Sequence, residues 1–245
     1  MNEAKKRFSL KDIIYLIVIV LLIGGLVTTS ILLVNKIKYE RIQYNAQDYY
    51  DKKLVQFEME NANLAKNQIV FIGDSITDLY HLDDYYQDLP LKTYNRGIGG
   101  DVTGCLVNRL KTSLYDLQPS KVVLMIGIND INGGVSKETI LENYQNILKG
   151  INTNLPTTKL FVMSILPIND LLSGAVDVDK SNEMVIDINS KIKDRVVSYP
   201  YEYLDLFSLV KDENNKLKKE YSDDGIHLND EGFKVWTNLV KPSLL

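Results

Sequence analysis

Short apolar runs alternate with amphipathic stretches along the chain from about residue 68 to its end. Runs typical of strands covered on both faces occupy residues 69–72, 121–126, 159–165 and 201–206, and a fifth short strand is expected near residues 92–95. Apolar residues at helical spacing fill the intervals, beginning near Val102, Ser136, Met184 and Asn229. This alternation predicts an α/β fold in which a mostly parallel five-stranded sheet lies between two helical layers.

A different pattern precedes this region. Residues 13–34 form a run of 22 residues without a charge, which is about the ~20 residues that cross a bilayer as a helix. The basic residues before and after this run are Lys5, Lys6, Arg7, Lys11, Lys36, Lys38 and Arg41. By a small margin they favour a cytoplasmic segment 1–12 and a transmembrane signal anchor 13–34, with the rest of the chain on the extracytoplasmic side of the cell membrane. A cleaved signal peptide is the alternative, although its apolar region usually spans only ~7–15 residues.

The rest of the chain has the composition of one globular domain. At 245 residues with 45% hydrophobic content, the chain can bury one substantial core. Residues 35–66 are mostly polar, with Leu54, Phe57 and Leu64 at roughly helical spacing. They predict a helical linker or stalk that either stands free or packs on the domain at 67–245. A net charge of -4, with acids and bases mixed along the chain, argues against a nucleic-acid surface.

Two motifs supply residues for nucleophilic catalysis. Gly-Asp-Ser-Ile-Thr follows the strand at 69–72 and contains Ser75, while Asp-Gly-Ile-His before the last helix contains Asp224 and His227. A serine hydroxyl needs a base to remove its proton and a third group to hold that base in the right tautomer, and an Asp three residues before a His on a loop can serve. The other histidine of the chain, His81, lies in a polar stretch and is expected at the surface. Taken alone, Ser75 would be an ordinary helix N-cap.

Two further segments supply groups for an oxyanion hole. Residues 95–101, Asn-Arg-Gly-Ile-Gly-Gly-Asp, contain glycines that let backbone N–H groups approach a ligand, and the amide of Asn129 follows the strand at 121–126. Each segment would be only a turn if it stood alone. Ligands bind at the carboxyl ends of the strands in such sheets, and Ser75, residues 95–101 and Asn129 all fall just beyond those ends.

In this order and spacing, the segments GDSIT, NRGIGGD, GIND and DGIH resemble the four conserved blocks of the SGNH/GDSL hydrolase family. The resemblance covers about residues 67–242 and is strongest to the branch related to platelet-activating-factor acetylhydrolase subunits, which share the run N-x-G-I-G-G-D. It implies a flavodoxin-like three-layer α/β/α sandwich that uses no cofactor. It also implies Ser75 as nucleophile, His227 as base and Asp224 as its partner. The implied oxyanion hole consists of the backbone N–H groups of Ser75 and Gly100 and the side chain of Asn129.

These observations predict a membrane-anchored, extracytoplasmic serine esterase that forms an acyl-enzyme at Ser75 and cleaves acetyl or short acyl esters. Its location makes esters of envelope glycans or lipids the first substrates to consider. Two alternatives stay open at this point. An acyltransferase would use the same triad and pass the acyl group to a sugar hydroxyl, and a tethered ligand-binding domain would keep the fold without catalysis.

The other polar and aromatic side chains have simpler expected roles. Cys105, the single cysteine, excludes an intrachain disulfide and is expected in core packing. Asp223 lies four residues before His227 and so lacks the three-residue spacing of Asp224. Residues 167–180 form the loop expected to set substrate specificity. Asp177, Asp179 and Asn182 are expected to be solvated in a surface loop. Tyr80, Tyr85 and Tyr86 either line a substrate pocket or are partly buried on a helix face. The sequence contains no HExxH, paired CxxC or EF-hand motif for a metal.

Overall fold

The fold is that of a computed structural model of the chain, in which residues 10–172, 174 and 176–245 are described. It divides into two units, Met1–Tyr49 and Tyr50–Leu245. Residues 1–9, which make up most of the predicted cytoplasmic segment, lie outside the described residues. So do residues 173 and 175 of the predicted specificity loop.

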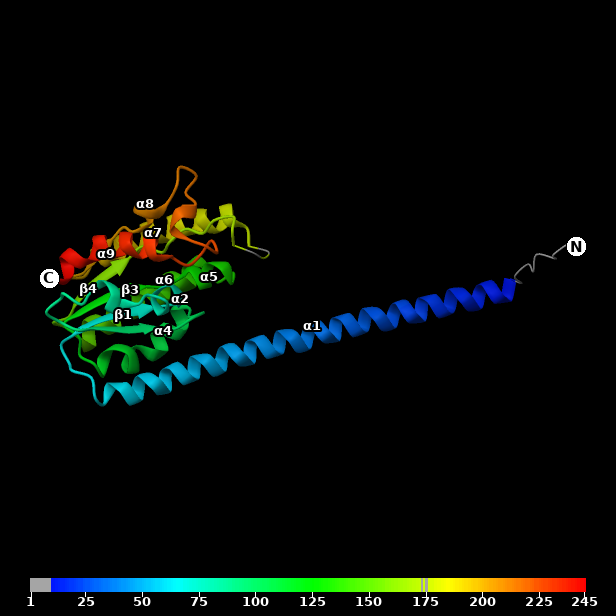
Figure 1. Ribbon diagram of the computed structural model, residues 1–245, viewed down its shortest axis with the longest axis horizontal. Coiled ribbons are helices and arrows are strands. Elements are labelled where there is room, and N and C mark those ends of the chain that lie inside the picture. Colours follow the sequence, from blue (N-terminus) through cyan, green and yellow to red (C-terminus); the bar gives the residue numbers. More distant parts are fainter. Residues whose placement is uncertain (1–9, 173, 175) are drawn as a thin grey trace, which may run out of the picture. The chain divides into compact units, whose positions relative to one another are not determined.

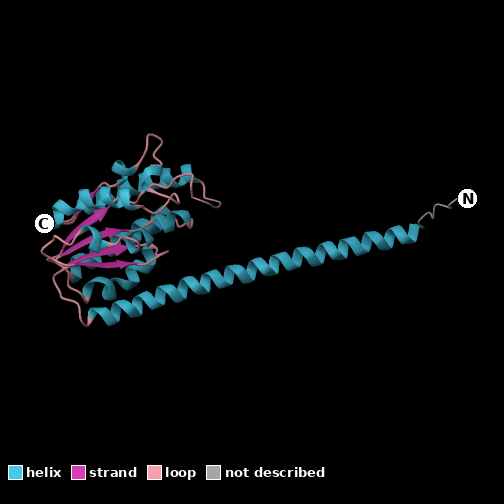
Figure 2. Ribbon diagram, in the orientation of Figure 1, coloured by secondary structure: helices cyan, strands magenta, loops and turns pink. Residues whose placement is uncertain are grey.

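A five-stranded parallel sheet forms the centre of the second unit, in the order β2-β1-β3-β4-β5 (Figure 1). The strands are β1 (Ile69–Gly73), β2 (Thr93–Gly97), β3 (Lys121–Met125), β4 (Lys159–Met163) and β5 (Glu202–Leu204). All neighbouring strands run in the same direction, as the arrows in Figure 2 show. The predicted five-stranded parallel sheet is therefore confirmed. The last strand is shorter than expected, because Leu206 has already left the sheet and caps a short helix.

Helices connect the strands and cover the sheet. They are α1 (Leu10–Asn61), α2 (Ser75–Asp78), α3 (Leu82–Tyr85), α4 (Thr103–Leu110) with the π-helical turn η1 (Lys111–Tyr115), α5 (Ile128–Asn132), α6 (Lys137–Asn154), α7 (Val178–Val196), α8 (Phe207–Val210), the 3-10 turn η2 (Lys219–Tyr221) and α9 (Asp230–Leu244). Of these, α4 packs against α6 and α6 against α7. The helices α2, α6, α7 and α9 begin at side-chain caps, in which Asp74, Ser136, Asp177 and Asn229 accept backbone N–H groups of the first turn.

The buried core explains why the helices pack on the sheet. Ile69, Val70, Phe71 and Ile72 of β1 are all buried, as expected of a central strand covered on both faces. The apolar stripes predicted for α4, α6 and α7 face inward, and the described core joins them to the sheet in one cluster. Burial of this apolar surface is the main favourable term in folding.

Two expectations about single side chains change in the structure. Cys105 is exposed, so the prediction that it packs in the core is wrong. It lies one position before Leu106, and a step of one residue on a helix turns a side chain away from the buried stripe. Tyr80 and Tyr86, by contrast, are buried in the core, where the Tyr80 ring stacks on Phe233 of α9 at 4.6 Å between ring centroids. The Tyr80 side chain therefore contributes to the packing of α9.

Candidate active site

Ser75, His227 and Asp224 form a continuous chain of hydrogen bonds. The Ser75 Oγ lies 2.8 Å from the His227 Nε2, and the His227 Nδ1 lies 2.6 Å from the Asp224 Oδ2. When Nδ1–H donates to the carboxylate, Nε2 carries a lone pair that can accept the serine proton. The structure thus brings Ser75 to the Asp224–His227 pair, although Ser75 and His227 are 152 positions apart in the sequence, in the geometry of an activated serine.

The local sequence places Ser75 at the carboxyl end of β1. Ser75 is the first residue of α2, and the Asp74 side chain caps this helix by accepting the Ile76 N–H at 3.0 Å. A side chain at Gly73 would collide with the Met125 carbonyl of β3, so only glycine allows the strand to end this close to its neighbour. Ser75 is therefore the N-terminal residue of a helix, although Asp74 supplies the cap that was considered for Ser75.

Asp74 itself is buried, and burial shifts the pKa of its carboxyl. Desolvation raises the pKa of Asp74 to about 7, against the opposing hydrogen bond from Ile76, and the nearby Asp101 and Asp130 act in the same direction as desolvation. The Asp74 Oδ1 accepts the Ile76 N–H and thereby caps α2. Asp74 is consequently a structural neighbour of the serine and not a second partner for the histidine.

Asp224 has the opposite electrostatic character. Partial burial acts to raise its pKa, but hydrogen bonds from the His227 ring and from the backbone N–H groups of His227 and Ile226 outweigh burial and lower the pKa to about 2. Both backbone groups donate to Oδ1, at 2.9 and 3.0 Å, which leaves Oδ2 for the imidazole. Asp224 therefore remains a carboxylate at neutral pH and fixes the orientation of the ring.

The turn between these two residues is held by the loop that follows β4. Gly225 has a φ of +89°, and a side chain there would also meet the backbone N of Leu172 at 2.4 Å. The Asn169 N–H donates to the Gly225 carbonyl at 2.9 Å, and Asn169 is buried. Residues 169 and 172, which belong to the loop predicted to set specificity, thus contact the Asp224–His227 turn and hold it in place.

Gly100 and Asn129 lie beyond the carboxyl ends of β2 and β3 and are linked through Asp101. The Asn129 Nδ2 donates to the Asp101 carbonyl at 2.9 Å, and an amide has a second N–H that can donate to a ligand. Gly100 is exposed, with a φ of +78°, in a turn closed by a 3.1 Å bond from the Asp101 N–H to the Ile98 carbonyl. The backbone N–H of this turn and the Asn129 amide are donors of the type that oxyanion holes use.

A buried arginine, which no motif of the sequence indicated, connects the strand before Ser75 to this turn. The Arg109 Nε donates to the Asp101 Oδ2 at 2.8 Å, and its two Nη atoms donate to the carbonyls of Arg96 and Gly73 at 2.9 Å each. The Arg109 and Asp101 side chains are 1% and 0% exposed, so each neutralises a charge that would otherwise be buried alone. The guanidinium holds the ends of β1 and β2 and the Gly100 turn in one arrangement.

A second buried carboxylate holds the helix that carries Asn129. The Asp130 side chain accepts the Thr103 N–H at 2.9 Å and the Thr103 hydroxyl at 2.6 Å. Thr103 is the first residue of α4, so these bonds fix α5 to the start of α4. Nothing in the spacing of Asp130 and Thr103 along the chain indicates this contact.

The other titratable residues considered from the sequence lie elsewhere. His81 is exposed and precedes α3, and Asp223 is exposed and accepts a 3.4 Å bond from Asn229. Asn182 is not solvated as expected, because it is buried in α7 and bonds to the backbone of Ile168. In the part of the chain that the structure describes, no group of three or more His, Cys, Asp or Glu side chains could hold a metal ion.

The chain matches known proteins over the region that contains this site. The model of the GDSL-like Lipase/Acylhydrolase family matches residues 71–235, which include Ser75, Gly100, Asn129, Asp224 and His227. The platelet-activating factor acetylhydrolase IB subunit alpha2 of Gallus gallus is 34% identical over 102 residues, or 40% of this chain and 44% of that protein. The chain thus matches less than half the length of this curated relative.

Solved structures match a larger part of the chain. A structure from Streptococcus pneumoniae that is named for platelet activating factor has a TM-score of 0.79 and 29% sequence identity, covering 85% of this chain and 99% of that one. A GDSL-like lipase from Bacteroides thetaiotaomicron has a TM-score of 0.68 and 21% identity, covering 78% of this chain and 96% of that one. The second likeness is one of fold alone.

Proposed function

Because the chain belongs to the GDSL-like lipase/acylhydrolase family, we propose that Ser75, His227 and Asp224 are the catalytic triad through which it hydrolyses esters. The chain is an ester hydrolase by its family, and the residue roles are our proposal. The observation that carries the proposal is the unbroken relay from the Ser75 hydroxyl through His227 to the Asp224 carboxylate, with heavy-atom distances of 2.8 and 2.6 Å.

The proposed reaction has two steps. In the first, the Ser75 Oγ attacks the ester carbonyl while His227 takes its proton, and His227 then gives that proton to the departing alcohol, leaving an acyl-enzyme. In the second step His227 removes a proton from water, which attacks the acyl-enzyme and releases the acid and Ser75. The N–H groups of Ser75 and Gly100 and the amide of Asn129 would stabilise the negative charge on the carbonyl oxygen in both steps.

We propose an acetyl or short acyl ester as the substrate. The relative from Gallus gallus is named an acetylhydrolase, and the chain shares the N-x-G-I-G-G-D run at residues 95–101 with the branch it resembles. A site built for an acetyl or similarly small acyl group would discriminate against extra methylenes. Envelope glycans and lipids carrying such esters would be the natural substrates of an enzyme fixed to the outer membrane face.

Chain-length selectivity tests this substrate class. We expect kcat/KM for 4-nitrophenyl esters to fall by about tenfold or more from acetate to butyrate and further to octanoate, since one extra methylene can cost ~10–200-fold in a fitted pocket. The measurement is 4-nitrophenol release by the purified full-length chain in detergent, with Ser75→Ala for the background. A rate that rises with chain length would contradict the short-acyl assignment, and a folded enzyme that cleaves none of the esters would contradict hydrolysis by this triad.

The membrane anchor is a separate part of the proposal. Within α1, Ile19–Lys38 is long and apolar enough to cross a bilayer, although a signal sequence would meet the same criteria. The hydroxyls of Thr28 and Thr29 donate to carbonyls one turn back, between 2.9 and 3.0 Å, so they would be satisfied in a lipid environment. These features support a helix that can span a bilayer. That it is an uncleaved anchor with the hydrolase domain outside the cytoplasm is our proposal, based on the 22-residue uncharged run and the basic residues around it.

Cell fractionation tests the anchor. We expect nearly all of the full-length chain in the membrane fraction and soluble only with detergent, while a chain lacking residues 1–35 stays soluble and keeps its specific activity. Protease added to intact cells should release the active domain if it faces outward. A mature chain that begins after residue 34 would show cleavage of a signal peptide, and protection from external protease would contradict the orientation.

A further inference from the structure

The last turns of α1 belong to the hydrolase domain and lie beside the Gly100 turn. Phe57 is 2% exposed, and the Arg96 guanidinium lies over its ring at 4.4 Å from the centroid. The Tyr50 hydroxyl donates to the Cys105 carbonyl at 3.3 Å, and the Asn61 amide donates to the Thr112 carbonyl at 2.7 Å. The segment that the sequence described as a linker or stalk therefore packs on the domain over residues 50–61.

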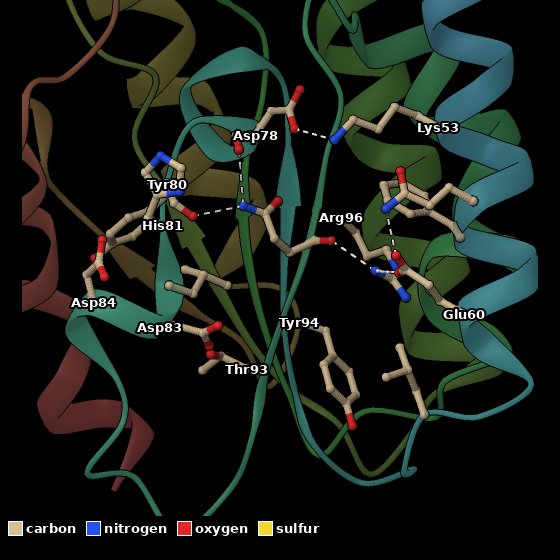
Figure 3. A pocket seen from close by; sticks show the side chains of 15 residues that line it. Lys53, Glu60, Asp78, Tyr80, His81, Asp83, Asp84, Thr93, Tyr94 and Arg96 are labelled. Atoms are coloured by element: carbon tan, nitrogen blue, oxygen red, sulfur yellow. Dashed lines mark hydrogen bonds and ion pairs between the residues drawn. The ribbon is translucent and has the colours of Figure 1, made fainter.

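The carboxylate of Asp78 joins this helix to the proposed oxyanion hole. Lys53 of α1 donates to the Asp78 Oδ1 at 2.6 Å, and the Gly99 N–H donates to the Asp78 Oδ2 at 3.1 Å. Gly99 immediately precedes Gly100, whose N–H is proposed to stabilise the oxyanion. Figure 3 shows Lys53 extending from α1 towards the Asp78 carboxylate. One side chain thus accepts hydrogen bonds from the membrane-side helix and from the oxyanion turn.

Asp78 is also fixed relative to the nucleophile. It is the last residue of α2, the four-residue helix that begins at Ser75, and its N–H donates to the Asp74 carbonyl at 2.9 Å. A side chain at Gly97 would lie 2.2 Å from the Asp78 backbone N, so the end of β2 is in direct contact with α2. A displacement of the Asp78 carboxylate would therefore change the position of the Gly99–Gly100 turn relative to Ser75.

A cavity separates part of α1 from the edge of the sheet, so ion pairs contribute much of the contact between them. A cavity of about 630 Å³ lies between α1, β2 and the α2–α3 segment, with Lys53, Phe57, Asp78 and Arg96 in its lining (Figure 3). The ion pairs Lys53–Asp78 at 2.6 Å and Arg96–Glu60 at 2.9 Å join residues of its lining. The Lys53 and Asp78 side chains are only 23% and 14% exposed, so solvent screens this pair less than a surface pair.

From this arrangement we propose that Lys53 is a positioning residue for ester hydrolysis. It holds the Asp78 carboxylate on the Gly99 N–H and thereby keeps the Gly100 N–H directed at the oxyanion. On this proposal, the end of α1 affects catalysis and does not only link the membrane anchor to the domain. The inference rests on the proposed role of Gly100 in the oxyanion hole.

Kinetics of Lys53→Met in the full-length chain test the proposal. We expect kcat for 4-nitrophenyl acetate to fall by roughly tenfold, less than the ~10²–10³-fold loss typical when an oxyanion donor is removed, with KM within about twofold. Lys53→Arg should restore most of kcat. Lys111→Met is the matched control, because it breaks a 2.7 Å ion pair with Asp116 at the surface and should leave kcat unchanged. A parental kcat in Lys53→Met would overturn the inference.

A double-mutant cycle separates positioning through Asp78 from a loss of folding. In Asp78→Asn the side-chain oxygen can still accept the Gly99 N–H without a charge for Lys53 to hold, so adding Lys53→Met to this variant should lower kcat by less than twofold further. If Lys53→Met costs the same factor with and without Asp78→Asn, or if its loss of kcat follows a loss of thermal stability that Lys53→Arg does not restore, Lys53 does not act through Asp78.

The same assays separate this inference from the proposed function. Ser75→Ala should be inactive whatever the role of Lys53. An active Ser75→Ala would mean that the triad assignment fails, and an inactive Ser75→Ala together with a parental Lys53→Met would mean that only the positioning role fails.

Discussion

Replacing Ser75 with alanine is expected to lower kcat for ester hydrolysis by about 10⁴–10⁶-fold, because the nucleophile is lost while the fold stays intact. His227→Ala should give a loss of similar size, since the serine then has no base at 2.8 Å to accept its proton. The two losses should not add in the double variant, because the residues act as one unit. The measurement is steady-state and burst-phase kinetics with 4-nitrophenyl acetate.

The chain offers a matched control for the histidine. His81 is the other histidine; it is exposed, precedes α3, and takes no part in the hydrogen bonds that join Ser75, His227 and Asp224. His81→Ala should therefore keep parental kcat and KM. Near-parental turnover in Ser75→Ala or His227→Ala, with circular dichroism showing a folded protein, would show that the triad is assigned to the wrong residues.

The sequence was informative where function depends on short segments. The carboxyl-end rule for parallel sheets placed Ser75, residues 95–101 and Asn129 at one edge. The structure puts Ser75, residues 98–101 and Asn129 beyond strand ends, whereas residues 95–97 still belong to β2 and pair with β1. The three-residue spacing of Asp224 and His227 also gave a local contact that the structure contains. Such features are readable because the interacting groups are neighbours along the chain or follow a fixed pattern.

The supporting contacts could not be predicted in the same way. Lys53 and Asp78 are 25 residues apart, and the Tyr80 hydroxyl meets Thr237 from 157 residues away. Pairing at such distances depends on how the layers pack, and periodicity does not report it. Cys105 shows that a prediction can also fail within one helix. The apolar stripe of α4 is buried as predicted, but Cys105, which lies next to the stripe, is exposed.

The buried charges around the site have a common consequence for its rigidity. Arg109 bonds to Asp101 and to the carbonyls of Gly73 and Arg96, and Asp130 bonds twice to Thr103. Buried ionic groups that lose a partner cost several kcal/mol, ~3–5 for a broken pair, so alternative positions of the turn are disfavoured. Donors fixed in this way need little reorganisation when negative charge develops on the substrate.

Asp224→Asn is expected to lower kcat by about 10⁴-fold, because an amide can no longer hold the Nδ1–H tautomer of His227 or stabilise the imidazolium. The parental carboxylate has a pKa of about 2, so it should stay ionised well below neutral pH, and Asp224 should not set the acid limb of the activity profile. The measurement is the pH dependence of kcat/KM for both proteins. An acid limb controlled by Asp224 in the parental enzyme would contradict the low pKa.

Asp223→Asn is the matched control for this last prediction. The two aspartates are adjacent and both exposed, but only Asp224 bonds to the His227 ring, at 2.6 Å, while Asp223 accepts a 3.4 Å bond from Asn229. The same change of charge at residue 223 should therefore leave kcat within about twofold, since an exposed charge interacts weakly through solvent. If the two variants lost activity equally, net charge on the turn would explain the effect, and the specific contact between Asp224 and the imidazole would not.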